Sequence, residues 1–271
     1  MEINTDISCN REHLKKCNRI VVKVGTSNLT YPNGQLNLQR IESLCTVLSD
    51  LMNQGKEMIL VTSGAIAVGA KRLGLAERPR DVRGKQAASA VGQAALIQIY
   101  QQFFSRYNRE VAQILLTKDI IQIEERKQNA RNTFFTLMEM GVIPLVNEND
   151  SVSTDELGFS ENDTLSSYVS IITESDLLIL LSDVDGLYDD PGLGPCAQLI
   201  YEIDEITETI EKIAGPSSTA LGTGGMATKL AAAGLSAEHG INAVIASGGD
   251  PTILWRILSG ERVGTLIKAK I

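Results

Sequence analysis

The chain has 271 residues, 43% of them hydrophobic, and its 25 lysine and arginine residues against 33 aspartate and glutamate residues give a formal net charge of -8. This composition suits one large α/β domain or two small ones, and the acidic balance argues against a nucleic-acid or anionic-membrane surface. No apolar run reaches the roughly 18 residues of a membrane span, and the polar N-terminus has no signal-peptide pattern, so we expect a cytoplasmic protein.

The chain opens with a polar lead-in, residues 1–18, and we expect one domain over residues 19–271. The first short apolar, β-branched run is RIVVKVG, residues 19–25. Similar runs follow at residues 57–63, 111–117, 141–147, 175–183, 242–249 and 264–269. Runs of this length indicate buried strands.

Longer segments with apolar residues at helical spacing separate these runs. Residues 37–55 form one such segment, which ends at Gly55, and residues 92–108 form another. Near-continuous apolar strands alternating with helices predict a mostly parallel sheet with both faces covered. A hairpin or loop is expected over residues 152–159.

Polar residues follow the predicted strands where each one ends. Lys23 and Gly25 lie at the end of the first run, and Ser63 lies at the end of the second. Asn147 and Asp150 lie at the end of the run over residues 141–147, and Ser182 and Asp183 at the end of the run over residues 175–183. Ligands of open α/β sheets bind at the carboxyl ends of the strands, so we expect these residues along one edge.

Residues 222–229 read GTGGMATK, which is the spacing of neither a P-loop nor a dinucleotide fingerprint. Its glycines let backbone N–H groups converge on an anion, and a helix beginning near Ala227 would add the positive end of its dipole. The alternative is a simple glycine-rich loop entering an alanine-rich helix, with Lys229 solvated. The segment after Asp183 does not continue as a calcium loop, since Leu187 and Tyr188 break the pattern, and we interpret it as an exposed loop at a nucleotide's edge.

Cysteine and histidine suggest neither a metal site nor general-base chemistry. The four cysteines (Cys9, Cys17, Cys45 and Cys196) form no C-x-x-C pair. The two histidines, His13 and His239, lie in the lead-in and near a helix end.

The motifs VVKVGTS, VTSGAIAVGA, KQAASAVGQ, VIPLVNENDSVS, ENDTLS, LLILLSDVDGLYD, GTGGMATK and VGTLI, in this order, resemble the glutamate 5-kinases of the amino acid kinase family. The resemblance implies an α/β fold, a three-layer αβα sandwich around a mainly parallel, open eight-stranded sheet. It also implies ATP-dependent phosphorylation of the γ-carboxylate of L-glutamate, the first step of proline biosynthesis. Many members carry a further C-terminal PUA domain, and we expect a form that lacks it.

The resemblance implies roles for individual residues. Lys23 and Lys229 flank the transferred phosphoryl group, and Asp163 holds both lysines. The residues that bind glutamate are Ser63, Asn147, Asp150 and Asn162. The residues that bind ATP are Lys23, Gly25, Ser182, Asp183, Thr223, Gly224, Gly225, Met226, Ala227, Thr228 and Lys229. Mg²⁺ is expected mainly through the ATP phosphates.

Within this assignment, Asp150 is the natural partner of the substrate's α-amino group. Ser160 and Glu161 precede Asn162 where family members commonly have Gly-Asp. An N-cap of the following helix is the structural alternative for Asp163.

Alternative functions are another acid kinase of this fold, such as an aspartokinase, and a non-catalytic amino-acid-binding regulator. By resemblance we expect a homotetramer and feedback inhibition by proline, with Arg83–Gln86 as a loop that shapes the amino-acid pocket.

Overall fold

The computed structural model describes residues 11–31, 33–152, 162–190, 196–215 and 225–270. Within them, the strands form one eight-stranded sheet in the order β3-β4-β2-β1-β5-β7-β8-β6. The strands are β1 (Arg19–Val24), β2 (Glu57–Val61), β3 (Val111–Leu116), β4 (Ile143–Glu148), β5 (Leu177–Ser182), β6 (Glu202–Ile203), β7 (Asn242–Ser247) and β8 (Thr265–Ile267).

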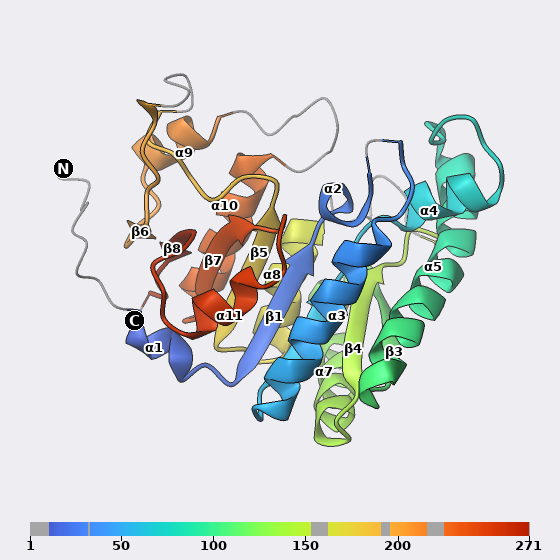
Figure 1. Cartoon of the computed structure of the whole chain (residues 1–271), viewed down its shortest axis with the longest axis horizontal. Helices are drawn as coiled ribbons and strands as arrows, with labels where there is room; N and C mark the ends of the chain where they lie inside the picture. Colours follow the sequence, from blue (N-terminus) through green and yellow to red (C-terminus); the bar gives the residue numbers. More distant parts are fainter. Residues whose placement is uncertain (1–10, 32, 153–161, 191–195, 216–224, 271) are drawn as a thin grey trace.

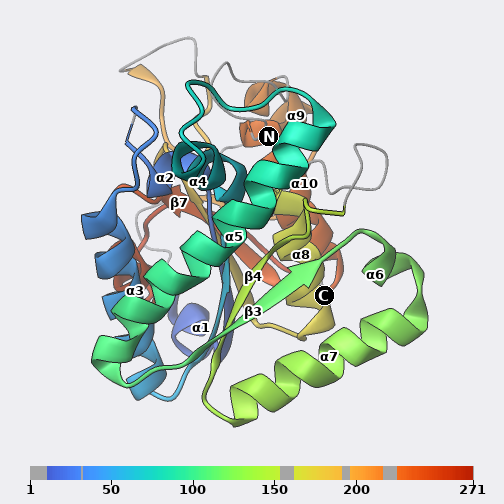
Figure 2. The same cartoon turned by 90° about the vertical axis from the view of Figure 1, so that its right-hand side faces the viewer.

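The sheet is parallel from β3 to β7. β8 runs antiparallel to β7, and β6 is parallel to β8, so these two strands run opposite to the other six. Helices cover both faces (Figures 1 and 2). The α/β fold class, a three-layer sandwich with a mainly parallel eight-stranded sheet, is confirmed.

The first helical layer packs with the core cluster that contains Val22 and Leu60. Its helices are α1 (Glu12–Lys15), α3 (Leu38–Asn53), α4 (Ala65–Arg72), α5 (Val82–Phe104) and α11 (Ile253–Leu258). The opposite layer packs with the cluster that contains Val21 and Val61. Its helices are α6 (Asp119–Gln122), α7 (Glu124–Glu139), α8 (Asn162–Ile172), α9 (Glu208–Ala214) and α10 (Met226–Glu238). The short helices α2 (Thr26–Leu29) and η1 (Ser105–Tyr107) complete the described helices.

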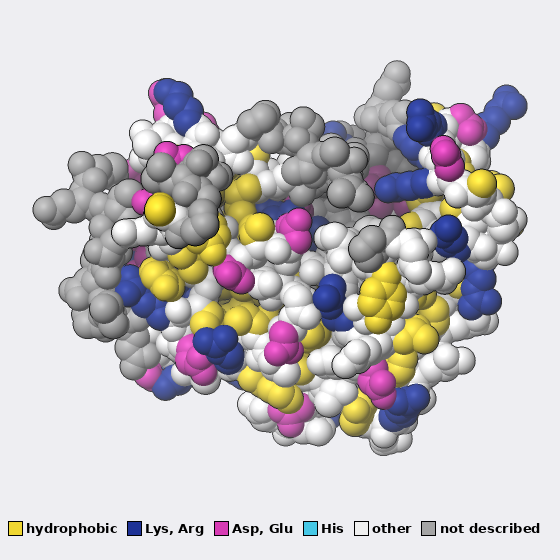
Figure 3. All heavy atoms as spheres, turned by 45° about the horizontal axis from the view of Figure 1, so that its top comes forward, with side chains coloured by type: hydrophobic (Ala, Val, Ile, Leu, Met, Phe, Trp, Pro, Cys, Tyr) yellow, Lys and Arg dark blue, Asp and Glu magenta, His cyan; other side chains and the backbone are white. Residues whose placement is uncertain are grey.

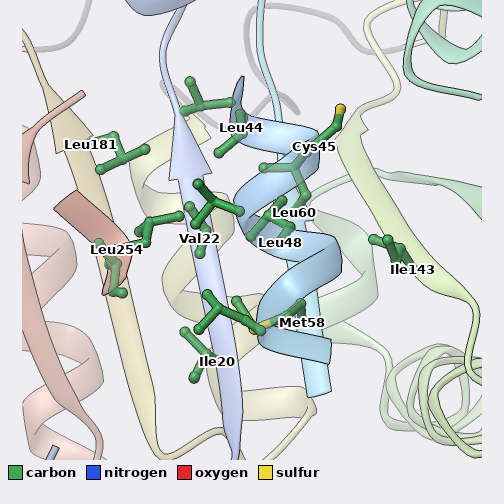
Figure 4. Close-up of a cluster of buried hydrophobic side chains, with 14 of the residues drawn as sticks. Ile20, Val22, Leu44, Cys45, Leu48, Met58, Leu60, Ile143, Leu181 and Leu254 are labelled. Carbon is green, nitrogen blue, oxygen red and sulfur yellow. The ribbon is translucent and has the colours of Figure 1, made fainter. Parts of the chain in front are cut away.

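Side chains of β1 alternate between the two layers, as a strand with both faces covered requires. Ile20 and Val22 point toward α3, where Leu44 and Leu48 meet them (Figure 4). Val21 lies in the opposite cluster. The same alternation places the next odd-numbered residue, Lys23, on the side of α8 and α10.

Helices α4 and α5 cross at backbone contact. A Cβ added at Gly69 would lie 1.7 Å from the Ala88 carbonyl oxygen, and one added at Gly92 would lie 1.8 Å from the Ala65 carbonyl oxygen. Only glycine fits at these two positions. The crossing fixes α5 against the loop that follows β2.

The N-terminal segment is tied to the far edge of the sheet. Arg11 is 1% exposed, and its guanidinium donates to the carbonyl oxygens of Tyr201 (2.6 Å) and Gly264 (3.1 Å). The described residues that precede β1 are therefore part of the packed structure.

Two details differ from the sequence predictions, and a third prediction is not tested. α5 begins at Val82, ten residues before the predicted segment, so Arg83–Gln86 is helical and the predicted loop is wrong. Asp81 caps this helix by accepting from the Gly84 N–H at 2.8 Å. The two-residue strand β6 is too short to give an apolar run. The hairpin predicted over residues 152–159 lies, beyond Val152, outside the described residues.

Candidate active site

The carboxyl ends of β1, β2, β4 and β5 lie level at one edge of the sheet. Lys23 is in register with Val61 of β2 and with Leu180 of β5, and Val61 is in register with Val146 of β4. The polar residues that end these strands therefore lie beside one another, as predicted.

Lys23 and Lys229 share one buried carboxylate at this edge. The Lys23 Nζ lies 2.6 Å from Asp163 Oδ1, and the Lys229 Nζ lies 3.4 Å from Asp163 Oδ2. Asp163 is 0% exposed, and each lysine is 6% exposed. The alternative of a solvated Lys229 is wrong.

Charge and hydrogen bonding keep Asp163 ionised. Burial alone would raise the pKa of its carboxyl, but the ammonium groups of Lys23 and Lys229 and a hydrogen bond from Thr228 bring that pKa below its ordinary value. The Thr228 hydroxyl lies 3.1 Å from Asp163 Oδ2. Asp163 is the second residue of α8 and not its cap, so the capping alternative is also wrong.

Small side chains bring α8 and α10 close enough for this bridge. The Ser167 hydroxyl of α8 donates to the Ala232 carbonyl oxygen of α10 at 2.7 Å. One turn further along, the hydroxyls of Ser170 and Ser236 lie 3.2 Å apart. The two helices thus begin side by side at the carboxyl edge, with Asp163 on one and Lys229 on the other.

Helix α10 begins where the sequence predicts. Gly225 is its N-cap and no side chain caps it, and Met226, Ala227 and Thr228 form its first turn. The first N–H groups of a helix have no acceptor within the helix and favour an anion. Thr223 and Gly224 lie outside the described residues.

An amide cluster lies on the other side of Asp163. The Asn162 amide nitrogen is 2.8–2.9 Å from three acceptors, the carbonyl oxygen of Thr62, the hydroxyl of Ser63 and Oδ1 of Asn147. Three of the residues predicted to bind the acceptor substrate, Ser63, Asn147 and Asn162, are therefore in direct contact.

The fourth, Asp150, follows β4 and accepts a hydrogen bond from the Ser89 hydroxyl of α5 at 3.1 Å. Burial raises the pKa of the Asp150 carboxyl, and the Ser89 hydrogen bond and the charges of Arg78 and Lys85 only partly oppose that shift. A bound ammonium group would lower this pKa. The carboxylate is suited to a cationic ligand.

The remaining predicted residues lie along the same edge. Ser182 is buried at the end of β5, and its hydroxyl is 3.1 Å from Oδ1 of the exposed Asp183. Gly25 lies directly beside the Lys23 ammonium group, since a Cβ added at Gly25 would lie 3.4 Å from the Lys23 Nζ. In the loop after Asp183, Val184, Asp185 and Asp190 are exposed, whereas Leu187 is 2% exposed and belongs to the core.

Two residues of this region were missed from the sequence. Ser89 and Gln93 are buried polar residues on α5; Ser89 contacts Asp150 just beyond β4, and Gln93 contacts Glu148 at the end of β4. Their spacing of four residues, with small and apolar neighbours, is the signal of one helical face. This spacing could be recognised only once the helix is known to begin at Val82, because the predicted helix began at residue 92.

A cavity of about 570 Å³ runs along α10 from its first turn. Ala227, Leu230, Ala231 and Gly234 line it on one side and Ile206 of the segment before α9 on the other. The cavity reaches the first turn of α10 at Ala227 and extends to Glu238 at the other end of that helix.

Two negative findings concern the described part of the chain. No group of three His, Cys, Asp or Glu side chains there could hold a metal ion, and none of its helices is long and apolar enough to span a membrane. On the face tilted toward the carboxyl edge, the coloured acidic and basic side chains are interspersed and form no broad patch of positive charge (Figure 3).

Sequence comparisons place these features in context. The profile of the amino acid kinase family matches residues 18–247. The glutamate 5-kinase of Clostridium perfringens is 51% identical over 265 residues, which are 96% of this chain and 98% of that protein. The glutamate 5-kinase of Enterococcus faecalis is 48% identical over 261 residues, with 94% of this chain and 96% of that protein covered.

Solved structures share the fold at low identity. The carbamate kinase from Giardia lamblia bound to AMP-PNP superposes with a TM-score of 0.67 at 16% identity, covering 94% of this chain and 99% of that one. The UMP kinase from Bacillus anthracis gives a TM-score of 0.62 at 18% identity, covering 94% and 97%.

Proposed function

The chain belongs to the amino acid kinase family, within its glutamate 5-kinase group, and we propose that it transfers the γ-phosphoryl group of ATP to the γ-carboxylate of L-glutamate. A carboxylate oxygen attacks the γ-phosphorus, the bond from that phosphorus to the β,γ-bridging oxygen breaks, and ADP leaves. The product is L-glutamyl 5-phosphate, and the step supplies proline biosynthesis. The protein is thus a transferase with a carboxyl group as acceptor.

The observation that carries this proposal is the Lys23–Asp163–Lys229 bridge beside the N-terminus of α10. A carboxylate with a reference pKa of about 4.3 is already ionised at neutral pH, so the reaction needs no general base. The difficulty is the approach of two anions. Two buried ammonium groups and free helical N–H groups neutralise that charge, and positioning of this kind dominates phosphoryl transfer.

On the acceptor side, we assign Ser63, Asn147 and Asn162 to the glutamate and Asp150 to its α-ammonium group. A partly buried carboxylate with a raised pKa gains most from a cationic partner. An N-acylated amine would offer no charge to Asp150. This supports a free amino acid as the acceptor.

On the donor side, we assign Lys23, Gly25, Ser182, Asp183 and the segment Thr223–Lys229 to ATP. The cavity along α10 shares Ala227 with this site, and we assign it to the rest of the nucleotide. Both Asp163 oxygens already contact cationic or hydroxyl groups, so Mg²⁺ would be held mainly by the ATP phosphates. When bound there, it supplies further charge neutralisation.

Inhibition by proline and a homotetramer are proposed from the family resemblance. A cytoplasmic location is proposed from the sequence. Another acid kinase activity, such as that of an aspartokinase, and a silent amino-acid-binding regulator are the alternatives. The presence of both lysines and Asp163 in one cluster supports catalysis over silence.

The test is ADP release from MgATP with a panel of acceptors. We expect turnover with L-glutamate and little with L-aspartate or N-acetyl-L-glutamate. Preferred turnover with aspartate would support the aspartokinase alternative. Glutamate binding without ADP release would support the regulator.

A further inference from the structure

We propose that Gln93 is a positioning residue for the acceptor: it fixes the orientation of the Asn147 amide, and through Asn147 that of Asn162. This inference rests on the proposed function, which assigns both asparagines to the glutamate. Gln93 itself contacts protein groups: the Glu148 carbonyl oxygen, Asn147 and Gln113.

Gln93 connects α5 to the end of β4. It is 7% exposed, and its Nε2 donates to the Glu148 carbonyl oxygen at 3.1 Å. Its Oε1 lies 3.3 Å from the Asn147 Nδ2. On the outer side, Gln113 of the edge strand β3 donates to the same Oε1 at 3.4 Å.

Two backbone groups of Glu148 determine the orientation of the side-chain amides of Gln93 and Asn147. The Glu148 N–H can only donate, and it lies 2.9 Å from Asn147 Oδ1. The Glu148 carbonyl can only accept, so Gln93 must present its nitrogen to it. Gln93 therefore presents its oxygen to the Asn147 nitrogen, and neither amide can turn over without losing a hydrogen bond.

The orientation of Asn147 carries over to Asn162. With Oδ1 of Asn147 facing Asn162, the Asn162 nitrogen turns toward that oxygen and toward Thr62 and Ser63. Its own Oδ1 is directed elsewhere and can accept a hydrogen bond from a ligand. Loss of Gln93 would leave the buried Asn147 nitrogen without this acceptor and weaken the constraint on both amides.

The helix that carries Gln93 is held rigidly. Its neighbour Gly92 meets the Ala65 carbonyl oxygen at backbone contact, and Ala65 opens the helix that follows Ser63. One turn earlier on α5, Ser89 holds Asp150. A displacement of Gln93 would need movement of the whole α4–α5 pair, which is what a positioning residue requires.

The test compares Gln93→Met with Gln98→Met, a control at an exposed position of the same helix. We expect kcat/KM for glutamate to fall roughly ten- to hundredfold in Gln93→Met, as loss of a buried hydrogen-bond partner implies. KM for ATP should stay within about twofold, because the nucleotide groups are untouched. Equal losses for both substrates, or none, would overturn the inference.

A double-mutant cycle separates action through Asn147 from an independent effect. If Gln93 acts through Asn147, Gln93→Met combined with Asn147→Ala should be no worse than Asn147→Ala alone. A loss of kcat/KM in the double variant equal to the product of the two single-variant losses would overturn the inference. Gln93→Glu has the same shape but cannot donate to the Glu148 carbonyl when ionised, and it should lose glutamate affinity even where Gln93→Met folds poorly.

A crystal structure of Gln93→Met gives a readout without catalysis. We expect Asn147 Oδ1 and Asn162 Nδ2 to move beyond hydrogen-bond distance in at least one conformer. Unchanged placement of both amides would refute the positioning role, whatever acceptor the enzyme uses. Absence of glutamate turnover in the unmodified protein would instead count against the proposed function.

Discussion

Replacement of Asp163 by asparagine removes one charge from between two ammonium groups and changes almost nothing in shape. Asp163 is 0% exposed, and its oxygens lie 2.6 Å and 3.4 Å from the two Nζ atoms. The variant leaves Lys23 and Lys229 buried, adjacent and without their shared anion.

The expected loss follows from this geometry. Removing one partner of a buried ion pair costs about 3–5 kcal/mol. Because asparagine fills the same volume and can still accept a hydrogen bond, we expect about 3 kcal/mol, the lower end of that range. For a domain of this size that corresponds to a drop in Tm of roughly 6–12 °C.

The effect has a defined pH dependence. The pKa of Asp163 is lowered in the folded protein from an ordinary value of 3.8. The stability it contributes is therefore present above pH 3.8 and lost as pH falls through the lower, folded pKa. The difference in unfolding free energy between the unmodified protein and Asp163→Asn should be constant from pH 6 to 8, because this range lies about two or more units above the ordinary pKa of the carboxyl. The difference should shrink only below about pH 4.

Urea unfolding at neutral pH measures this difference directly. Asp204→Asn is the matched control: its carboxylate lies 2.8 Å from the Lys268 Nζ but its side chain is 82% exposed. The control should change the unfolding free energy by less than about 1 kcal/mol. A loss below about 1 kcal/mol in Asp163→Asn as well would refute the claim that Asp163 carries two buried charge contacts.

Four further predictions concern catalysis, recognition and packing. Lys229→Met should lower kcat by about 10²-fold or more in an ADP-release assay, and near-normal turnover would exclude it from the phosphoryl site. Asp150→Asn should raise KM for glutamate far more than KM for ATP. In the unmodified enzyme, KM for glutamate should also rise on acidification, because the raised pKa of Asp150 lets its carboxylate be protonated. The variant should lose this pH dependence. Gly69→Ala should destabilise the fold by more than about 3 kcal/mol or prevent folding, since its Cβ would meet the Ala88 carbonyl at 1.7 Å, whereas Gly249→Ala, with nothing nearer than 3.5 Å, should be tolerated; equal stability of the two variants would contradict the close crossing. Proline should compete with glutamate, since it offers the same α-groups but no side-chain carboxylate; activity that is indifferent to millimolar proline, about 10⁻³ M, would reject this feedback.

Much of the fold could be predicted because its signals are local. Seven of the eight described strands are apolar runs, and the polar residues at their ends lie along one edge because parallel strands share a direction. β6 could not be found in this way, since two residues carry no period. The early start of α5 was missed because its first two turns contain Gly84 and polar residues, and their helical state depends on the Asp81 cap.

The candidate site was predictable as a set of residues but not as a set of contacts. Family resemblance gave Lys23, Asp163 and Lys229, but only the packed structure shows that all three are buried. Small serine side chains on α8 let α10 pack closely against it. Gln93 could not be assigned at all. Its role depends on the direction of two amides, which backbone groups of Glu148 determine in three dimensions.

The measurement that tests the central claim most directly is trapping of the product with hydroxylamine. An acyl phosphate reacts with hydroxylamine to give a hydroxamate, so MgATP and L-glutamate should yield γ-glutamyl hydroxamate in a one-to-one ratio with ADP. The yield should fall by about 10²-fold with Lys229→Met. ADP without hydroxamate, or hydroxamate formed equally well from N-acetyl-L-glutamate, would contradict the assignment of this edge as a glutamate phosphorylation site.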